Sequence, residues 1–282
     1  MLNGVVIFAI GLVLANAEPE ARQKRNGEFT QYFLYNRIAE GAELNLKTPS
    51  PDVLRYLPTV VIVHGHEGSY DTSLNLDLRR EFLESQDVNV ISVDWSIYSH
   101  MTYEQAQNFV LSIGEFLANF LRNQQINLAS THLIGFDLGA HIVGVAGRKL
   151  NGVARITGLS PTANDIKLSS TDAKYVEVIH TGTGCSSRKG IADKLGQADF
   201  YPNGGNCQPG CPNSDCHHNR SWMYFAASIR DNTFNANCCN NMFEKDVNIC
   251  KGSYIPMGNN KLGKMPCQSG LYRVNTKDSY PF

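Results

Sequence analysis

A single carboxylate occupies a position where local backbone geometry would expose it. Residues 133–141 read Leu-Ile-Gly-Phe-Asp-Leu-Gly-Ala-His, and an apolar run that passes through two spaced glycines predicts a strand, a sharp turn and a helix. The middle residue, Asp137, is expected in a strained conformation that projects its side chain above the sheet. Gly135 and Gly139 permit the bend and the close packing of helix on strand. Asp137 is therefore the first candidate for chemistry.

Other reactive groups follow neighbouring strands. The apolar, β-branched run at 59–63 predicts a buried central strand, and residues 154–158 are expected to form another strand. His66 follows the first of them and Ser160 the second. Active groups of such sheets belong on loops at the carboxyl ends of the strands, which is where His66, Asp137 and Ser160 all fall.

The order of predicted elements defines the fold class. Strands are expected at 29–35, 59–63, 88–95, 131–135, 154–158 and 175–179, with helices at 74–83, 103–122 and 138–150. This alternation predicts an α/β fold with a mostly parallel central sheet and helices on both faces. Together with the strand, turn and helix at 133–141, this arrangement resembles the α/β-hydrolase fold. Beyond residue 185 the pattern indicates loops, with one clear helix over 222–230.

Composition and the first residues restrict the partners and the compartment. The 282 residues are 42% apolar and 18% charged, with a formal charge of −1, so nothing favours nucleic acid or an anionic membrane surface. The uncharged apolar run 1–14, followed by Ala-Asn-Ala, predicts a signal peptide over 1–17 and a secreted product. A membrane anchor is the alternative, but the run is too short to span, and no second apolar span appears. We expect a loose segment at 18–28 and one domain at 29–282.

Eight cysteines in an exported chain indicate disulfides. They are Cys185, Cys207, Cys211, Cys216, Cys238, Cys239, Cys250 and Cys267. Eight cysteines allow more than a hundred pairings, and only a Cys211–Cys216 loop is favoured here. A zinc site built from Cys207, Cys211, Cys216 and His217 or His218 is the alternative, although no metal and no cofactor are expected.

Several stretches resemble the animal pancreatic-type lipase family, in particular its insect phospholipase A1-like and yolk-protein-like branch. The resemblance runs from about residue 32 to residue 282. It rests on Val61-Ile62-Val63-His64-Gly65, Val93-Asp94-Trp95-Ser96, His132-Leu133-Ile134-Gly135, Arg155-Ile156-Thr157-Gly158-Leu159, Val178-Ile179-His180-Thr181, Ala198-Asp199-Phe200-Tyr201-Pro202-Asn203-Gly204-Gly205 and Gln208-Pro209-Gly210-Cys211.

The resemblance assigns slots to individual residues. The nucleophile slot, normally serine, holds Asp137; the acid slot, normally aspartate, holds Ser160; and the base slot holds His218. The oxyanion-hole slots are the amides of His66 and Leu138. The two cysteines that flank the family's lid match Cys211 and Cys216, which only four residues separate here. The resemblance also implies that no C-terminal C2-like domain follows.

Exchange of serine and aspartate predicts loss of ordinary serine-hydrolase activity. A carboxylate at Asp137 is stabilised by the helix N-terminus and repels a developing oxyanion, while Ser160 lies on the far side of His218 from the amide donors. We therefore expect a protein that binds or carries lipid or another apolar small molecule, with protein partners left open.

Two enzymatic alternatives remain open. One is an active lipase or phospholipase A1 with a rearranged triad. The other is a hydrolase with Asp137 as nucleophile on saturated carbon, with Asp165 as the possible replacement acid.

Two further expectations concern the surroundings of this site. The apolar side chains of Phe136, Leu138, Trp222 and Phe225 are candidates for lining a cleft. Asn219 begins an Asn-Arg-Ser sequon beside His218 and is a candidate for glycosylation.

Overall fold

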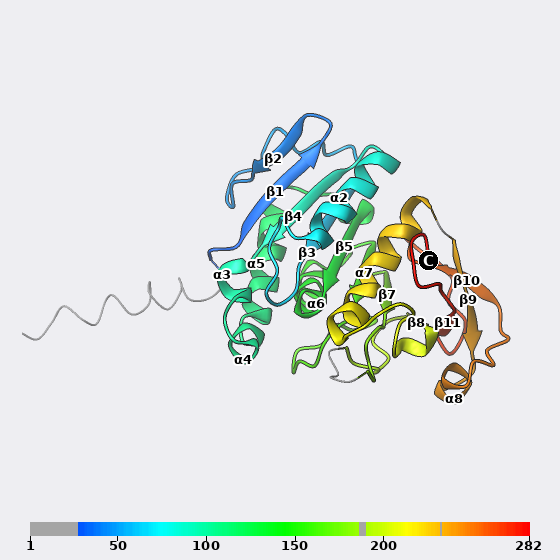
Figure 1. Cartoon of the computed structure of the whole chain (residues 1–282). Coiled ribbons are helices and arrows are strands. Elements are labelled where there is room, and N and C mark those ends of the chain that lie inside the picture. Colours follow the sequence, from blue (N-terminus) through cyan, green and yellow to red (C-terminus); the bar gives the residue numbers. More distant parts are fainter. Residues whose placement is uncertain (1–27, 186–189, 232) are drawn as a thin grey trace, which may run out of the picture.

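The central sheet grows from short β-branched runs, as the alternation of elements predicts. The computed structural model describes residues 28–185, 190–231 and 233–282. The predicted signal peptide over 1–17 lies outside the described residues, as does the 18–28 segment except for Glu28. Within the described residues eleven strands form one sheet in the order β10-β9-β11-β8-β7-β6-β5-β3-β4-β1-β2 (Figure 1).

A parallel block forms the middle of this sheet, and antiparallel strands flank it on each side. The parallel strands are β3 (Thr59–Val63), β4 (Asn89–Asp94), β5 (Thr131–Phe136), β6 (Arg155–Leu159), β7 (Tyr175–Ile179), β8 (Ala198–Pro202) and β11 (Leu271–Val274). The antiparallel strands are β1 (Gln31–Asn36), β2 (Ala39–Glu43), β9 (Phe234–Cys239) and β10 (Tyr254–Met257). The predicted α/β class with a mostly parallel sheet is confirmed.

Helices cover both faces, and the strands divide their side chains between two cores. The α-helices are α2 (Ser73–Ser85), α3 (Ser96–Ser99), α4 (Tyr103–Gln107), α5 (Val110–Asn123), α6 (Leu138–Leu150), α7 (Ser214–Arg230) and α8 (Met242–Asp246), and the 3-10 turns are η1 (Leu128–Ser130) and η2 (Asn203–Gly205). Val61 and Val63 pack in the core that includes side chains of α5 and α6, whereas Val60 and Ile62 pack in the core with α2 and α7. This alternation follows from the two-residue period of a strand.

Two features of the sequence-based prediction were wrong. The helix predicted over 103–122 is two helices, because the Asn108 and Phe109 amides donate to carbonyls three residues back and interrupt the α-helical hydrogen bonding. The loop-rich region predicted after residue 185 contains β8, β9, β10 and β11. In β9 the sequence is Phe-Asn-Ala-Asn-Cys-Cys, and asparagine has low strand propensity, so pairing and covalent bonds decide its structure.

Disulfides fix this last third. The favoured pair Cys211–Cys216 is confirmed, and the other pairs are Cys185–Cys207, Cys238–Cys267 and Cys239–Cys250. All three cysteines of the alternative zinc set are therefore in disulfides. His217 Nδ1 accepts a hydrogen bond from the Gln208 amide at 2.9 Å instead. Among the described residues, no helix combines the length and the apolar character needed to cross a bilayer.

A buried ionic cluster ties the C-terminal segment to the sheet. Glu177 accepts hydrogen bonds from Arg155 at 2.9 Å, from the Gly258 amide at 2.9 Å and from the Tyr175 hydroxyl at 2.8 Å. Lys264 donates to the same carboxylate and to the Gly258 carbonyl. Burial raises the pKa of Glu177, but Arg155 and Lys264 outweigh it and lower the pKa. Burial also lowers the pKa of Lys264 to about 8.

Neutralising Glu177 tests the importance of this cluster. Glu177→Gln leaves Arg155 and Lys264 buried without their counter-charge, so we expect a loss of about 3 kcal/mol in the free energy of unfolding. Guanidinium unfolding measures it. The matched control is Asp193→Asn, because Asp193 pairs with Lys167 at the surface, and its loss should be within about 0.5 kcal/mol. Equal effects of the two variants would contradict the prediction.

Candidate active site

The turn at Asp137 has the strained geometry that its sequence predicts. Asp137 joins β5 to α6 with φ at 56° and ψ at −121°, a conformation that residues other than glycine rarely adopt. A Cβ on Gly135 would lie 2.1 Å from the Gly139 carbonyl oxygen, and a Cβ on Gly139 would lie 2.4 Å from the Val63 carbonyl oxygen. Both positions therefore require glycine for the helix to pack on the strands.

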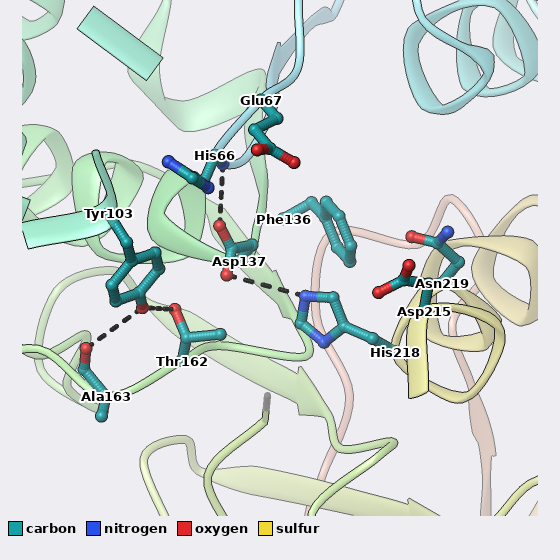
Figure 2. A pocket seen from close by; sticks show the side chains of 10 residues that line it. All are labelled: His66, Glu67, Tyr103, Phe136, Asp137, Thr162, Ala163, Asp215, His218 and Asn219. Carbon is teal, nitrogen blue, oxygen red and sulfur yellow. Dashed lines mark hydrogen bonds and ion pairs between the residues drawn. The ribbon is translucent and has the colours of Figure 1, made fainter. Parts of the chain in front are cut away.

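The Asp137 carboxylate lies between a loop amide and an imidazole. Its Oδ2 accepts a hydrogen bond from the His66 amide at 2.8 Å, and its Oδ1 lies 3.6 Å from His218 Nε2, an ion-pair distance (Figure 2). Only 5% of the residue is exposed. Burial raises its pKa, but His218 and the amides of His66 and Leu138 together lower it below the ordinary value. Asp137 is therefore ionised at neutral pH.

Ser160 approaches the opposite nitrogen of the same imidazole. It follows β6 with φ at 43°, and none of its surface is exposed. Its hydroxyl donates to the Thr181 carbonyl at 2.7 Å, and its oxygen lies 2.8 Å from His218 Nδ1. Because the serine hydrogen is committed to Thr181, Nδ1 is the donor in the contact with His218. Asp137 and Ser160 therefore contact opposite nitrogens of the His218 ring.

Helix α7 and its neighbours hold His218 in place. The His218 carbonyl accepts hydrogen bonds from the hydroxyls of Thr181 and Ser221, each at 3.0 Å. Its ring packs on Phe136, with ring centroids 4.6 Å apart. The backbone and one ring nitrogen are therefore fixed before any ligand arrives.

The two oxyanion-slot residues contribute in different ways. The His66 side chain points away from Asp137, since its Nε2 donates to the Met101 carbonyl at 2.9 Å. Only its amide faces the carboxylate. Leu138 is fully buried at the start of α6.

A cavity of about 480 Å³ opens at this site. It is lined by His66, Glu67, Tyr103, Phe136, Asp137, Thr162, Ala163, Asp215, His218 and Asn219 (Figure 2). Sequence reasoning missed Tyr103 and Thr162, whose hydroxyls hydrogen-bond at 2.7 Å. Burial, followed by the charge of Asp137, raises the pKa of Tyr103 to about 12. Thr162 could have been predicted from the sequence, because it lies two residues after Ser160 at the end of a predicted strand.

The remaining candidate residues differ in whether they line the cavity, lie at the surface or are buried in the core. Asn219 is half-buried in its wall, so a glycan there would occupy the opening. Asp165, considered as a replacement acid, is exposed and does not line the cavity. Leu138 and Phe225 are core residues with no exposed surface. Trp222 lines a neighbouring cavity.

Sheet topology and the strand–turn–helix at Asp137 together define an α/β-hydrolase scaffold. A family model described as Lipase matches residues 20–282. The chain belongs to the lipase family.

Individual relatives give the extent of the likeness. Pancreatic lipase-related protein 2 of Cavia porcellus is 38% identical over 187 residues, covering 61% of this chain and 43% of that protein. The probable phospholipase A1 magnifin of Vespa magnifica is 33% identical over 238 residues, covering 74% and 67%. Inactive pancreatic lipase-related protein 1 of Homo sapiens is 34% identical over 204 residues, covering 61% and 44%.

The chain spans about half the length of most of the curated relatives it matches. A solved α/β serine hydrolase without lid from Xanthomonas campestris is 13% identical, with a TM-score of 0.39 over 72% of this chain and 88% of that chain. The relatives' names cover both an inactive protein and a phospholipase A1, so activity has to be argued from the chemistry of the site.

The charge on Asp137 predicts a pH-dependent contribution to stability. Because its pKa is lowered in the folded state, the contribution is present above the pKa of the unfolded aspartate and is lost as the pH falls through the folded value. We expect Asp137→Asn to be less stable by about 1–3 kcal/mol at about pH 7, with the difference narrowing as the pH falls below the pKa of the unfolded aspartate, about 4.

Urea unfolding across this pH range measures the effect. Asp165→Asn is the control, since that carboxylate is exposed. A stability difference between Asp137→Asn and the wild type that stays constant with pH would contradict the assignment of an ionised, stabilising carboxylate.

Proposed function

We propose that this chain is an extracellular lipid-binding protein built on a lipase scaffold that has lost ordinary ester hydrolysis. The observation that carries the proposal is the position of the Asp137 carboxylate, 2.8 Å from the His66 amide and facing His218 Nε2. A serine hydrolase needs a hydroxyl at this point and free amides beside it. Here the Asp137 carboxylate stands where the hydroxyl is needed and also occupies the His66 amide.

This carboxylate opposes acyl transfer in two ways. Its negative charge repels an oxyanion that would develop at the same amides, and each lost oxyanion donor costs about 3–4 kcal/mol of transition-state stabilisation. Attack by the carboxylate on an ester would give an anhydride that readily reverts. Removal of the serine from such a triad lowers turnover by about 10⁶-fold.

The second candidate is an active lipase or phospholipase A1 with Ser160 as nucleophile. It is favoured by one observation, the 2.8 Å contact between Ser160 Oγ and His218 Nδ1. Three features oppose it: Ser160 has no exposed surface, its hydrogen is donated to Thr181, and it lies on the opposite side of the imidazole from the His66 amide.

The cavity supports retention of a lipid-like ligand. Its volume of about 480 Å³ falls within the usual range for small-molecule sites. Phe136 and Tyr103 provide aromatic surface, while His218 and Thr162 provide polar groups. Membership of the lipase family favours a lipid over other apolar ligands.

Extracellular location is supported by the four disulfides, which persist in oxidising compartments. The predicted signal peptide over 1–17 agrees with this location. Protein secreted from expressing cells should therefore be disulfide-bonded and begin near residue 18, which N-terminal sequencing of the product checks.

Natively purified protein tests the proposal directly. We expect solvent extraction to release a lipid in molar proportion to protein, and we expect no turnover of phosphatidylcholine or a short-chain ester above the uncatalysed rate. A fluorophosphonate probe should leave the protein unlabelled. Turnover together with labelling that Ser160→Ala abolishes would refute the proposal and favour the rearranged triad.

Placing serine at position 137 and aspartate at position 160 should restore some ester hydrolysis. The double variant Asp137→Ser with Ser160→Asp places a hydroxyl at the turn and a carboxylate at His218 Nδ1, so we expect measurable short-chain ester hydrolysis. Asp137→Ser alone is the matched control and should be about 10⁴-fold slower, because the triad then lacks its acid. A double variant that folds, by circular dichroism, and stays inert would mean that the exchange is not what silences the site.

A further inference from the structure

One wall of the cavity at Asp137 belongs to the loop over residues 160–174, which connects β6 to β7. Thr162 and Ala163 of this loop line the cavity and lie beside Tyr103 (Figure 2). The Tyr103 hydroxyl donates to Thr162 Oγ1 at 2.7 Å. The position of the loop therefore sets part of the shape of the cavity.

A buried histidine of α6 holds this loop through both of its ring nitrogens. His141 has no exposed surface. Its Nε2 lies 2.8 Å from the Thr162 carbonyl oxygen, and its Nδ1 accepts a hydrogen bond from the Leu168 amide at 3.0 Å. Because Nδ1 is an acceptor, the ring hydrogen is on Nε2, which donates to Thr162. Only the neutral ring makes both contacts.

Protonation of this ring is incompatible with the observed position of the loop. A hydrogen on Nδ1 would point at the Leu168 amide hydrogen, so two donors would face each other across 3.0 Å in the protein interior. The Leu168 side chain is fixed in the hydrophobic core, with only 1% of the residue exposed. The imidazolium would therefore shift away from Leu168, and Thr162, hydrogen-bonded to the other nitrogen, would shift with it.

The surroundings of His141 favour its neutral form. Burial lowers the pKa of the ring, and the charge of Lys167 acts in the same direction. The Thr162 carbonyl and the charge of Asp137 raise the pKa, but the net effect places it below its ordinary value. The observed contacts are therefore present at neutral pH and are lost as the pH falls below the ordinary histidine value of about 6.5.

The other charged groups of the loop are engaged in ion pairs. Lys167 pairs with Asp193 at 2.9 Å at the surface. Arg148, on the same helix as His141, pairs with Asp172 at 2.9 Å near the end of the loop. These pairs involve groups that stay charged over the range in which a histidine titrates. His141 is therefore the group of this loop contact that changes its charge in mild acid.

We propose that His141 is a pH switch on the 160–174 loop, whose protonation displaces the cavity wall at Thr162 and releases the bound ligand. This inference rests on the proposed lipid-binding function and adds its regulation. Such a switch suits a carrier that retains its ligand at neutral pH and releases it in an acidified compartment.

Hydrogen exchange tests the switch without any ligand. Exchange of the backbone amides over 162–172 is measured by mass spectrometry at about pH 7.5 and about pH 5, on either side of the ordinary histidine pKa. Each rate is corrected for the intrinsic effect of pH on exchange. Protection of this segment in the wild type should fall by about tenfold, the effect of roughly one pH unit of proton linkage. The readout is confined to the segment that His141 contacts, which separates it from protonation elsewhere.

Replacing the ring by an amide should remove the pH response. In His141→Gln the side-chain nitrogen can donate to Thr162 and the side-chain oxygen can accept from Leu168, but the group does not titrate. Protection over 162–172 should then be the same at both pH values. His100→Gln is the matched control, because His100 is exposed and does not line the cavity. This control should keep the response of the wild type.

A second measurement applies if His141→Gln does not fold. Nuclear magnetic resonance of the ¹⁵N-labelled wild type follows both ring nitrogens of His141 and the Leu168 amide. The amide should lose its protection over the same pH range in which Nδ1 gains its hydrogen. A Leu168 amide that stays protected while the ring is protonated would overturn the switch.

Ligand release is measured separately. The probe is 1-O-octyl glycerol, used below its critical micelle concentration, because it has no titratable group and no ester bond. Isothermal titration calorimetry should show wild-type affinity that is about tenfold weaker at about pH 5 than at about pH 7.5, with no such change in His141→Gln.

The outcomes separate the two proposals. Protection and affinity that both fall with pH in the wild type, but not in His141→Gln, support the switch. A fall in protection that His141→Gln shares, or no fall in the wild type, overturns the switch and leaves lipid binding intact. Loss of protection with unchanged affinity overturns the release of ligand. Absence of probe binding at both pH values contradicts the proposed lipid binding, and hydrogen exchange still decides whether the loop responds to His141.

Discussion

The site depends on a steric constraint at the end of β5, where three backbone segments meet with no side chain between them. Gly135 and Gly139 let α6 pack against β5 and β3. At Gly65 a Cβ would lie 2.5 Å from the Cβ of Asp137, so the adjoining loop also approaches without a side chain. This close approach brings the His66 amide to the Asp137 carboxylate, and residue 137 has a positive φ at the turn into α6. The backbone geometry therefore fixes the position of the side chain at residue 137, regardless of which residue is there.

The electrostatics of the site follow from that geometry. A carboxylate that is almost fully buried requires compensation, and two backbone amides and His218 provide it. The same donors would otherwise be available to stabilise an oxyanion. Stabilisation of Asp137 and stabilisation of a tetrahedral intermediate therefore compete for one set of groups. Under the proposed function, this competition favours ligand binding over acyl transfer. The hydroxyls of Tyr103 and Thr162 are neutral polar groups on the cavity wall.

Sequence alone predicted the parts of this protein that depend on local pattern. The bounds of β3 and β7 matched because each is a short segment rich in β-branched residues. The turn at Asp137 matched because glycine spacing determines it. Tyr103 was missed because its place in the cavity depends on a tertiary contact, the hydrogen bond from its hydroxyl at the start of α4 to Thr162, which hydrophobic periodicity does not reveal. Strand β9 was missed because two disulfides and pairing with β10 and β11 stabilise a sequence of low strand propensity. Most disulfide partners likewise depend on the tertiary structure, which spacing does not encode.

The placement of Asp137 and Ser160 on opposite nitrogens of one imidazole also bears on how such a chain changes over generations. Aspartate at both positions would leave two buried carboxylates sharing a single ring, so at least one would lack a counter-charge. Serine at both would leave that ring between two neutral hydroxyls. Either single substitution thus removes the pairing of one carboxylate with one imidazole. The effect of a change at position 137 on folding therefore depends on the residue at position 160. On the proposal that the two residues have traded places, a return to the usual arrangement passes through one of these less favourable intermediates.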